Sequence, residues 1–131
     1  MKTLVSLLVL ILLLASCTPS MNFLASSVVP AATGKVQVKR DKNSNYQIKV
    51  DVQNLAPADR LTPPQRNYIV WMESDRNTVK KLGLIEPSSK NLKASLNATA
   101  VADPSRVFIT AESSPETQYP GGTEVLATGR R

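Results

Sequence analysis

The stretch GKVQVKRDKNSNYQIKVDV, residues 34–52, carries the pattern that decides the fold. Apolar and polar side chains alternate through its first and last parts, and residues 41–45 between them are rich in Asp, Asn and Ser, which are typical of turns. An alternation with a period of two places one set of side chains on each face of an extended strand. The stretch therefore predicts a hairpin of two half-buried strands, with Val36, Val38 and Ile48 on its inner face.

The chain continues with a loop and then its most apolar strand. Leu55 breaks the alternation, which indicates a bulge or the end of the strand near Asn54. Residues 56–66 carry prolines at positions 57, 63 and 64 and cannot form an interior strand. In NYIVWMES, residues 67–74, both the odd-numbered and the even-numbered positions carry apolar side chains. We therefore expect a central strand that is covered on both faces.

Four further strand segments follow, separated by proline and glycine. They are VKKLGLIE (79–86), LKASLNATA (92–100), RVFITAE (106–112) and TEVLATG (123–129). About seven short strands without a credible amphipathic helix predict an all-β fold, a single antiparallel, Greek-key-like β-sandwich. Because aromatic residues make up only 5% of the chain, we expect an aliphatic core around Tyr68, Trp71 and Phe108.

The N-terminal segment has the order of a secretion signal. Lys2 is followed by an apolar run and then by small residues before Cys17. The run is shorter than the roughly 20 residues that a membrane-spanning helix needs. Leu14 to Cys17, LASC, resembles the lipobox of bacterial lipoproteins. The resemblance implies cleavage between Ser16 and Cys17 and lipid on Cys17; an ordinary secretory signal or a short buried helix are the alternatives.

These patterns divide the chain into three parts. We expect a helical signal peptide over residues 1–16, a lipid-attached tether over residues 17–33 and the sandwich domain over residues 34–131. Five apolar residues lie within the expected tether, which leaves open that part of it lies on the bilayer or docks as an extra edge strand. They are Met21, Phe23, Leu24, Val28 and Val29.

Charge and cysteine content limit the partners. The net charge is +6, and removal of residues 1–16 leaves 15 basic against 10 acidic residues, or +5. Such a charge attracts anionic lipids, glycans or nucleic acid, but an exported protein does not meet nucleic acid, and the charges are dispersed as on a solvated surface. With one cysteine and no histidine, we expect no disulfide, no metal site and no cofactor.

The sequence contains no pattern of catalytic residues, so we expect no enzyme. No histidine is present to activate a serine or cysteine, and the carboxylates fall mostly at predicted turns and strand ends. Tyr68 and Trp71 either line a binding site or pack in the core. Glu112 shares a face with Phe108 and Thr110, where its carboxylate would accept hydrogen bonds from backbone amides of the turn over residues 113–122.

NYIVWMES with KKLGLIE, and the closing RVFITAESSPETQYPGGTEVLATG, resemble the extracytoplasmic C-terminal domain of anti-sigma-K-type factors over residues 34–129. The resemblance rests on Tyr68, Trp71, Gly83, Phe108, Thr110, Glu112, Pro115, Pro120, Gly121, Val125, Leu126 and Gly129. It implies the sandwich fold and a sensing or binding role. Members with anti-sigma activity carry a cytoplasmic domain and a membrane-spanning helix, which are not found here, so no direct contact with a sigma factor is expected.

We therefore expect a membrane-anchored lipoprotein whose non-enzymatic sandwich serves interaction or envelope sensing, with an envelope protein or a glycan as partner. The alternative is a structural or carrier lipoprotein that holds a glycan or hydrophobic ligand between its sheets and exposes Tyr68 or Trp71 in a pocket. Thr18 rather than Asp follows Cys17. This favours the periplasmic face of an outer membrane where the organism has one, and otherwise the outer face of the cytoplasmic membrane.

Overall fold

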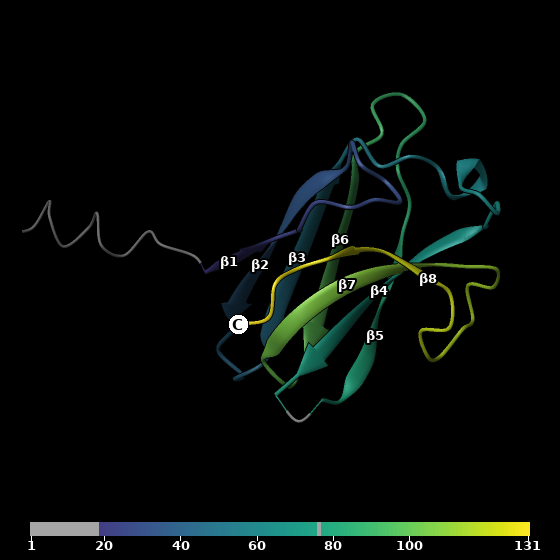
Figure 1. The fold of residues 1–131 in the computed structure, drawn as a ribbon. Coiled ribbons are helices and arrows are strands. Elements are labelled where there is room, and N and C mark those ends of the chain that lie inside the picture. Colours follow the sequence, from purple (N-terminus) through teal and green to yellow (C-terminus); the bar gives the residue numbers. More distant parts are fainter. Residues whose placement is uncertain (1–18, 76) are drawn as a thin grey trace, which may run out of the picture.

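Two four-stranded antiparallel sheets pack face to face in the computed structural model, which describes residues 19–75 and 77–131 (Figure 1). The first sheet has the order β1 (Ser20–Asn22), β2 (Thr33–Arg40), β3 (Tyr46–Gln53) and β6 (Ala94–Ala100). The second has the order β5 (Val79–Ile85), β4 (Asn67–Ser74), β7 (Pro104–Glu112) and β8 (Thr123–Ala127). The expected signal peptide, its cleavage site at Ser16 and the lipid site Cys17 lie outside the described residues.

The fold is the expected all-β sandwich. Each of the seven strand segments that the sequence indicates forms a strand, and β1 is an eighth. The chain leaves the first sheet after β3, returns to it as β6 beside β3, and crosses again to place β7 beside β4. These crossings between sheets form the Greek-key connection.

The hairpin of β2 and β3 has the register that the alternation requires. Val36 pairs with Val50 and Val38 with Ile48, so that apolar side chains share the inner face. The Asp41 carboxylate accepts hydrogen bonds from the backbone amides of Asn43 and Asn45, which stabilises the turn. At the other end β3 stops at Gln53, and Asn54 has a φ of 56°. The break that Leu55 makes in the alternation of apolar and polar residues therefore marks the end of the strand and not a bulge within it.

The core between the sheets is mainly aliphatic, whereas Trp71 lies on the other side of the second sheet. Val70 and Ile109 have no exposed surface, and Tyr68 joins them in the core. Trp71 packs with Ile69 and Phe108 in a separate small cluster. Both faces of β4 are thus covered, which explains why the side chains on both faces of this strand are apolar.

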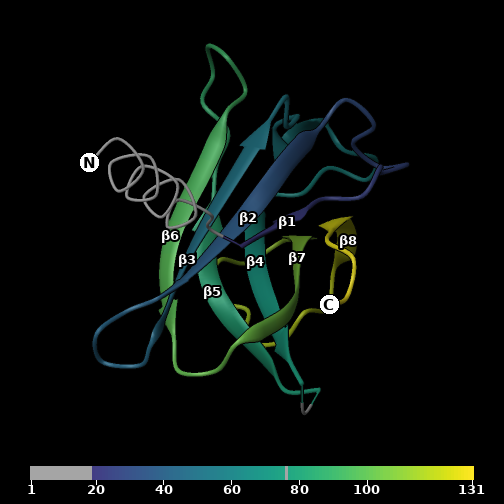
Figure 2. The same ribbon diagram turned by 90° about the vertical axis from the view of Figure 1, so that its left-hand side faces the viewer.

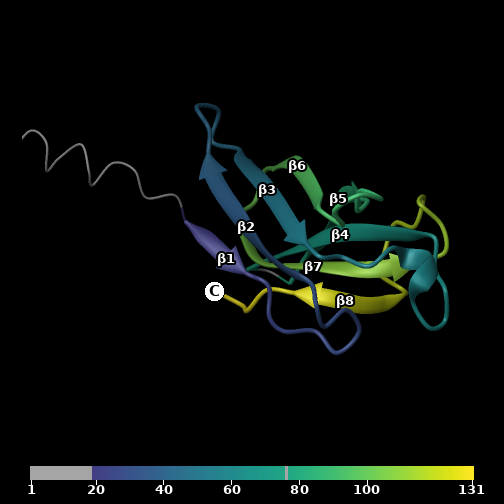
Figure 3. The ribbon, with the colours of Figure 1, turned by 90° about the horizontal axis from the view of Figure 1, so that it is seen from above.

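Residues 19–33 belong to the sandwich, and the structure here differs from the expected tether. Met21 in β1 is buried, as are Val29 and Ala32 further along. The segment then runs beside β8, where the Leu24 amide donates to the Ala127 carbonyl at 2.9 Å and the Ser26 hydroxyl to the Val125 carbonyl (Figure 3). These residues close one side of the sandwich because burial of their apolar side chains outweighs the cost of ordering them.

The two ends of the sandwich differ in their connections. One, the hairpin end, carries the β2–β3 turn, the β4–β5 turn, the β6–β7 connection and the C-terminal residues 128–131. The other, the loop end, carries the longer segments 54–66, 86–93 and 113–122. Residues of the segments 54–66 and 86–93, together with the start of β4 and the end of β5, border the cavity at the loop end.

Candidate functional site at the loop end

A cavity of about 510 Å³ lies at the loop end, where the segment after β3 faces the start of β4 and the end of β5. Its lining residues are Pro57, Ala58, Asp59, Gln65, Arg66, Asn67, Tyr68, Leu84, Ile85, Glu86 and Pro87. This volume is within the range of sites that bind small molecules or peptide side chains, roughly 300–1,000 Å³.

Backbone hydrogen bonds hold the cavity wall in place. The short 3₁₀ helix η1 (Ala58–Arg60) is followed by a bend in which the Gln65 amide donates to the Ala58 carbonyl at 3.0 Å. The Arg66 amide donates to the Glu112 carbonyl, which ties the segment to the end of β7. The cavity wall is therefore shaped by its own backbone and is joined to the second sheet.

Tyr68 is one of the lining residues and holds the segment after β3 in place. Its hydroxyl donates to the Ala56 carbonyl at 2.6 Å, and the residue is 2% exposed. Burial, assisted by the charge of Asp59, raises the pKa of Tyr68 to about 12. The exposed aromatic that the carrier alternative required is not found, because Tyr68 and Trp71 are both buried.

The cavity is lined by both polar and apolar residues, and its charged residues are of both signs. Arg66, Asp59 and Glu86 are exposed lining residues, and Asn67 is half-buried. Leu84 adds a side chain that is 44% exposed. Such a mixed lining suits a segment of a partner that has both polar and apolar groups better than a wholly hydrophobic ligand.

A buried polar chain on the outer face of the second sheet fixes the neighbouring loop. The Trp71 indole donates to the Thr110 hydroxyl at 2.8 Å, and that hydroxyl donates to Glu112 Oε1 at 2.8 Å. The same oxygen accepts hydrogen bonds from the Gly121 and Gly122 amides at 3.0 and 2.9 Å. Glu112 therefore makes the bonds to the turn that its place in the strand predicts.

The loop over residues 113–122 also reaches the far edge of this sheet. The Lys81 ammonium of β5 donates to the Pro115 carbonyl at 2.6 Å. Gly122 is required for close packing, since a Cβ there would lie 1.9 Å from the Ala111 carbonyl oxygen. Trp71 and Glu112 thus have positioning roles and do not line the cavity.

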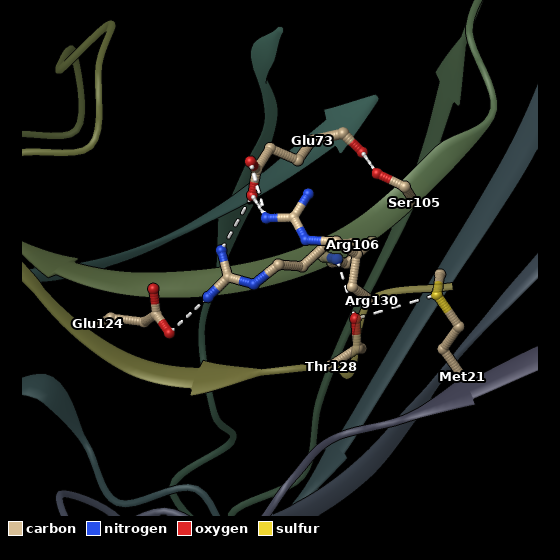
Figure 4. Close-up of polar contacts among 8 residues, drawn as sticks. Met21, Glu73, Ser105, Arg106, Glu124, Thr128 and Arg130 are labelled. Atoms are coloured by element: carbon tan, nitrogen blue, oxygen red, sulfur yellow. Dashed lines mark hydrogen bonds and ion pairs between the residues drawn. The ribbon is translucent and has the colours of Figure 1, made fainter. Parts of the chain in front are cut away.

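Ion pairs cover the remainder of the outer face of the second sheet (Figure 4). Arg106 pairs with Glu73 at 3.2 Å and with Glu124 at 2.7 Å, while its guanidinium lies over the Phe108 ring. Arg130 also pairs with Glu73, at 3.1 Å. Burial acts to raise the pKa of Glu73, but the hydrogen bonds from Arg130 and Arg106 together outweigh it and lower that pKa.

The first sheet can be followed in Figure 2 as β1, β2, β3 and β6. Its outer face has a different character, because its side chains are polar and its charges mostly positive. Lys35, Lys39 and Lys49 are exposed on it, and Lys93 lies just before β6. Asp51, opposite Lys35 in the register, is the one carboxylate at an outward position of these strands in the described part of the chain.

Sequence reasoning did not identify the cavity. Its charged and amide residues come from three separate segments, and no local motif marks them. The basic face could have been found, because Lys35, Lys39 and Lys49 all occupy the positions of their strands that alternate with the buried apolar residues.

Within residues 19–75 and 77–131, no helix has the length and apolar character needed to cross a bilayer, and no cluster of acidic, Cys or His side chains could hold a metal ion.

Comparisons with protein families, with curated proteins and with solved structures found no significant match to this chain.

Proposed function

We propose that the chain is a lipid-anchored lipoprotein of the bacterial cell envelope, and that its sandwich is a non-enzymatic interaction or sensing module that binds its partner at the loop-end cavity. The LASC sequence at residues 14–17 supports the anchor. The resemblance of residues 34–129 to the extracytoplasmic domains of anti-sigma-K-type factors supports the sensing role. A domain held outside the membrane does not meet a sigma factor in the cytoplasm.

The positions of β1 and the cavity are the observation that carries the proposal. β1 begins at Ser20, three residues after Cys17, and three extended residues span at most about 11 Å. Ser20 lies opposite Gln37, on the side of the sandwich closed by β8. The cavity lies at the loop end beside β5, the opposite edge of the second sheet. A lipid on Cys17 would therefore leave the cavity open to a partner.

The chemistry of the cavity favours a polypeptide segment of an envelope protein over a hydrophobic ligand. Arg66, Asn67 and Glu86 offer both donors and acceptors to a peptide backbone and to charged side chains. Leu84 offers the most exposed apolar side chain, beside Pro57 and Pro87. A hydrophobic ligand would leave most of these polar groups without partners, which costs binding free energy.

Metabolic labelling tests the anchor. Cells that express the full chain and are fed an alkyne fatty acid are expected to label the protein, and Cys17→Ala is expected to abolish the label because no other thiol is present. Ser6→Ala, which keeps the cysteine and the apolar run, serves as the matched control and is expected to be labelled like the wild type. Equal labelling of the wild-type chain and Cys17→Ala would contradict the anchor.

Site-specific photocrosslinking in cells tests the recognition site. A photoreactive residue at Leu84, in the cavity wall, is expected to give one discrete crosslinked product, and Arg66→Ala is expected to weaken it. The matched control places the probe at Val101, which is 72% exposed at the hairpin end and is expected to give no such product. The proposal fails if the probe at Leu84 gives no product, or if both positions give the same one.

A further inference from the structure

The outer face of the first sheet carries an uncompensated positive charge. Four exposed lysines make up what we call the lysine face: Lys35, Lys39, Lys49 and Lys93. None of them forms an ion pair with a described residue, whereas Arg106, Arg130 and Arg131 all pair with carboxylates. With Asp51 as the one carboxylate at an outward position of these strands among the described residues, the lysine face carries a net positive charge.

The lysines are arranged in pairs around two shallow hollows. Lys39 and Lys49 border one of about 360 Å³, together with Gln37, Gln47 and Asn97. Lys35 and Lys93 border the other, of about 400 Å³, in which Ser95 supplies a hydroxyl and Asp51 the one carboxylate. Two ammonium groups with neighbouring amides or hydroxyls match the charge and hydrogen-bonding needs of a phosphate.

The same sheet is the one that would be held closest to the bilayer. β1 is its edge strand, and Ser20 and Asn22 lie beside Gln37 and Lys35 of β2. The three residues from Cys17 to Ser20 span at most about 11 Å. So short a connection keeps the sheet near the membrane and allows its lysines to approach the surface to within the distance of about 8 Å over which charges act in physiological salt.

We propose that the lysine face docks on anionic phospholipid headgroups of the membrane that anchors the chain. The proposal rests on the lipid anchor of the proposed function, and its evidence is charge complementarity and the position of β1. No apolar side chain occupies an outward position on these strands in the described structure, so the contact is electrostatic and does not require insertion into the bilayer. The second sheet, with the cavity beside β5, then faces away from the membrane.

Lysine acylation in nanodiscs tests the docking. The full lipidated chain is placed in nanodiscs of phosphatidylcholine alone or of phosphatidylcholine mixed with phosphatidylglycerol. A water-soluble acetylating reagent is added, and mass spectrometry measures the rate of acetylation at each lysine. The four lysines of the face are expected to react several-fold more slowly in the anionic discs, and high salt is expected to remove the protection. Lys80 and Lys90, exposed on other parts of the molecule, are expected to react equally in both.

Charge variants provide the matched comparison. Lys35→Gln with Lys49→Gln is expected to reduce the protection of Lys39 and Lys93, while Lys80→Gln with Lys90→Gln, which removes the same charge elsewhere, is expected to leave it unchanged. All these side chains are exposed, so the fold should persist, and unchanged emission of buried Trp71 checks this.

Two outcomes would overturn the inference. Equal reactivity of the four lysines in both kinds of disc would exclude docking on anionic lipid. Protection by a soluble polyanionic glycan but not by anionic discs would assign the face to a glycan instead. An intact mass without lipid on Cys17 would contradict the proposed function, whereas a lipidated chain with equal lysine reactivity would contradict this inference alone.

Discussion

At the scale of single residues, the buried carboxylate of Glu112 organises one end of the molecule. It is 6% exposed and forms no ion pair with a described residue. Three hydrogen bonds, from Thr110, Gly121 and Gly122, offset the cost of removing its charge from water. Because Thr110 also accepts from Trp71, the loop and the indole are held by one connected set of bonds.

Gly122→Ala is expected to destabilise the protein by about 1–3 kcal/mol, because a Cβ there would meet the Ala111 carbonyl oxygen at 1.9 Å and Glu112 Oε2 at 2.9 Å. Gly121→Ala is the matched control, since no atom lies within 4 Å of its added Cβ. Urea unfolding gives the free energies, and the emission of Trp71 reports whether the loop has moved. Equal effects of the two substitutions would show that Gly122 is not the close contact.

At the scale of elements, the short strand β1 and the segment after it decide where the domain begins. β1 has only three residues, but residues 23–32 continue across to β8 and bury Val29 and Ala32. Thr128 joins the two sheets at this side, since its hydroxyl accepts from the Val107 amide and lies 3.9 Å from Met21 Sδ (Figure 4). The domain therefore includes residues that a boundary at residue 34 would omit.

Met21→Ala is expected to lower the free energy of unfolding by about 2–3 kcal/mol, the cost of removing a buried side chain and leaving a cavity. Asn22→Ala changes an exposed residue of the same strand and is expected to shift stability by less than about 0.5 kcal/mol. Denaturant unfolding of both variants measures the difference. A free tether would leave both variants as stable as the wild type, and that result would contradict the packing of β1.

At the scale of the whole molecule, charges are distributed unequally between the two sheets. The outer face of the second sheet neutralises its arginines through Glu73 and Glu124, and Arg131 pairs with Asp103 near the C-terminus. The lysines on the outer face of the first sheet form no ion pair with a described residue. One side of the sandwich is thus internally compensated, and the other is available to an anionic surface.

Acid is expected to remove part of the stability that Glu73 provides. Its pKa in the folded state lies below the ordinary value of 4.5, so protonation favours the unfolded chain. The contribution is present above about pH 4.5 and is lost as the pH falls through the lowered pKa. Glu73→Gln is expected to cost about 1 kcal/mol at neutral pH and progressively less in acid.

Urea unfolding at a series of pH values from neutral to about 3 measures this difference. Glu124→Gln is the comparison, since Glu124 makes one ion pair and its side chain is 47% exposed, so a smaller effect is expected. A constant difference between Glu73→Gln and the wild type across the series would show that the ion pairs of Glu73 do not contribute to stability.

The alternation of apolar and polar residues was enough to predict the strands, the hairpin with its inner face and the all-β sandwich, because strand periodicity is a local property. Parity also placed Glu112 on one face with Thr110, close to the turn whose amides it binds. The apolar run that contains Tyr68 and Trp71 predicted that both faces of β4 are covered, again from local sequence alone.

The tertiary structure alone decided the rest, because the remaining features depend on contacts between distant segments. The Trp71–Thr110 bond requires the register of β4 against β7, and the cavity requires residues 57–59, 65–68 and 84–87 to meet at one end. Residues 19–33 look like a tether in isolation, and it is the open side of the sandwich that gives their apolar side chains a place to pack. Local sequence determines which way a side chain points from its strand, but the pairing of strands determines what it contacts.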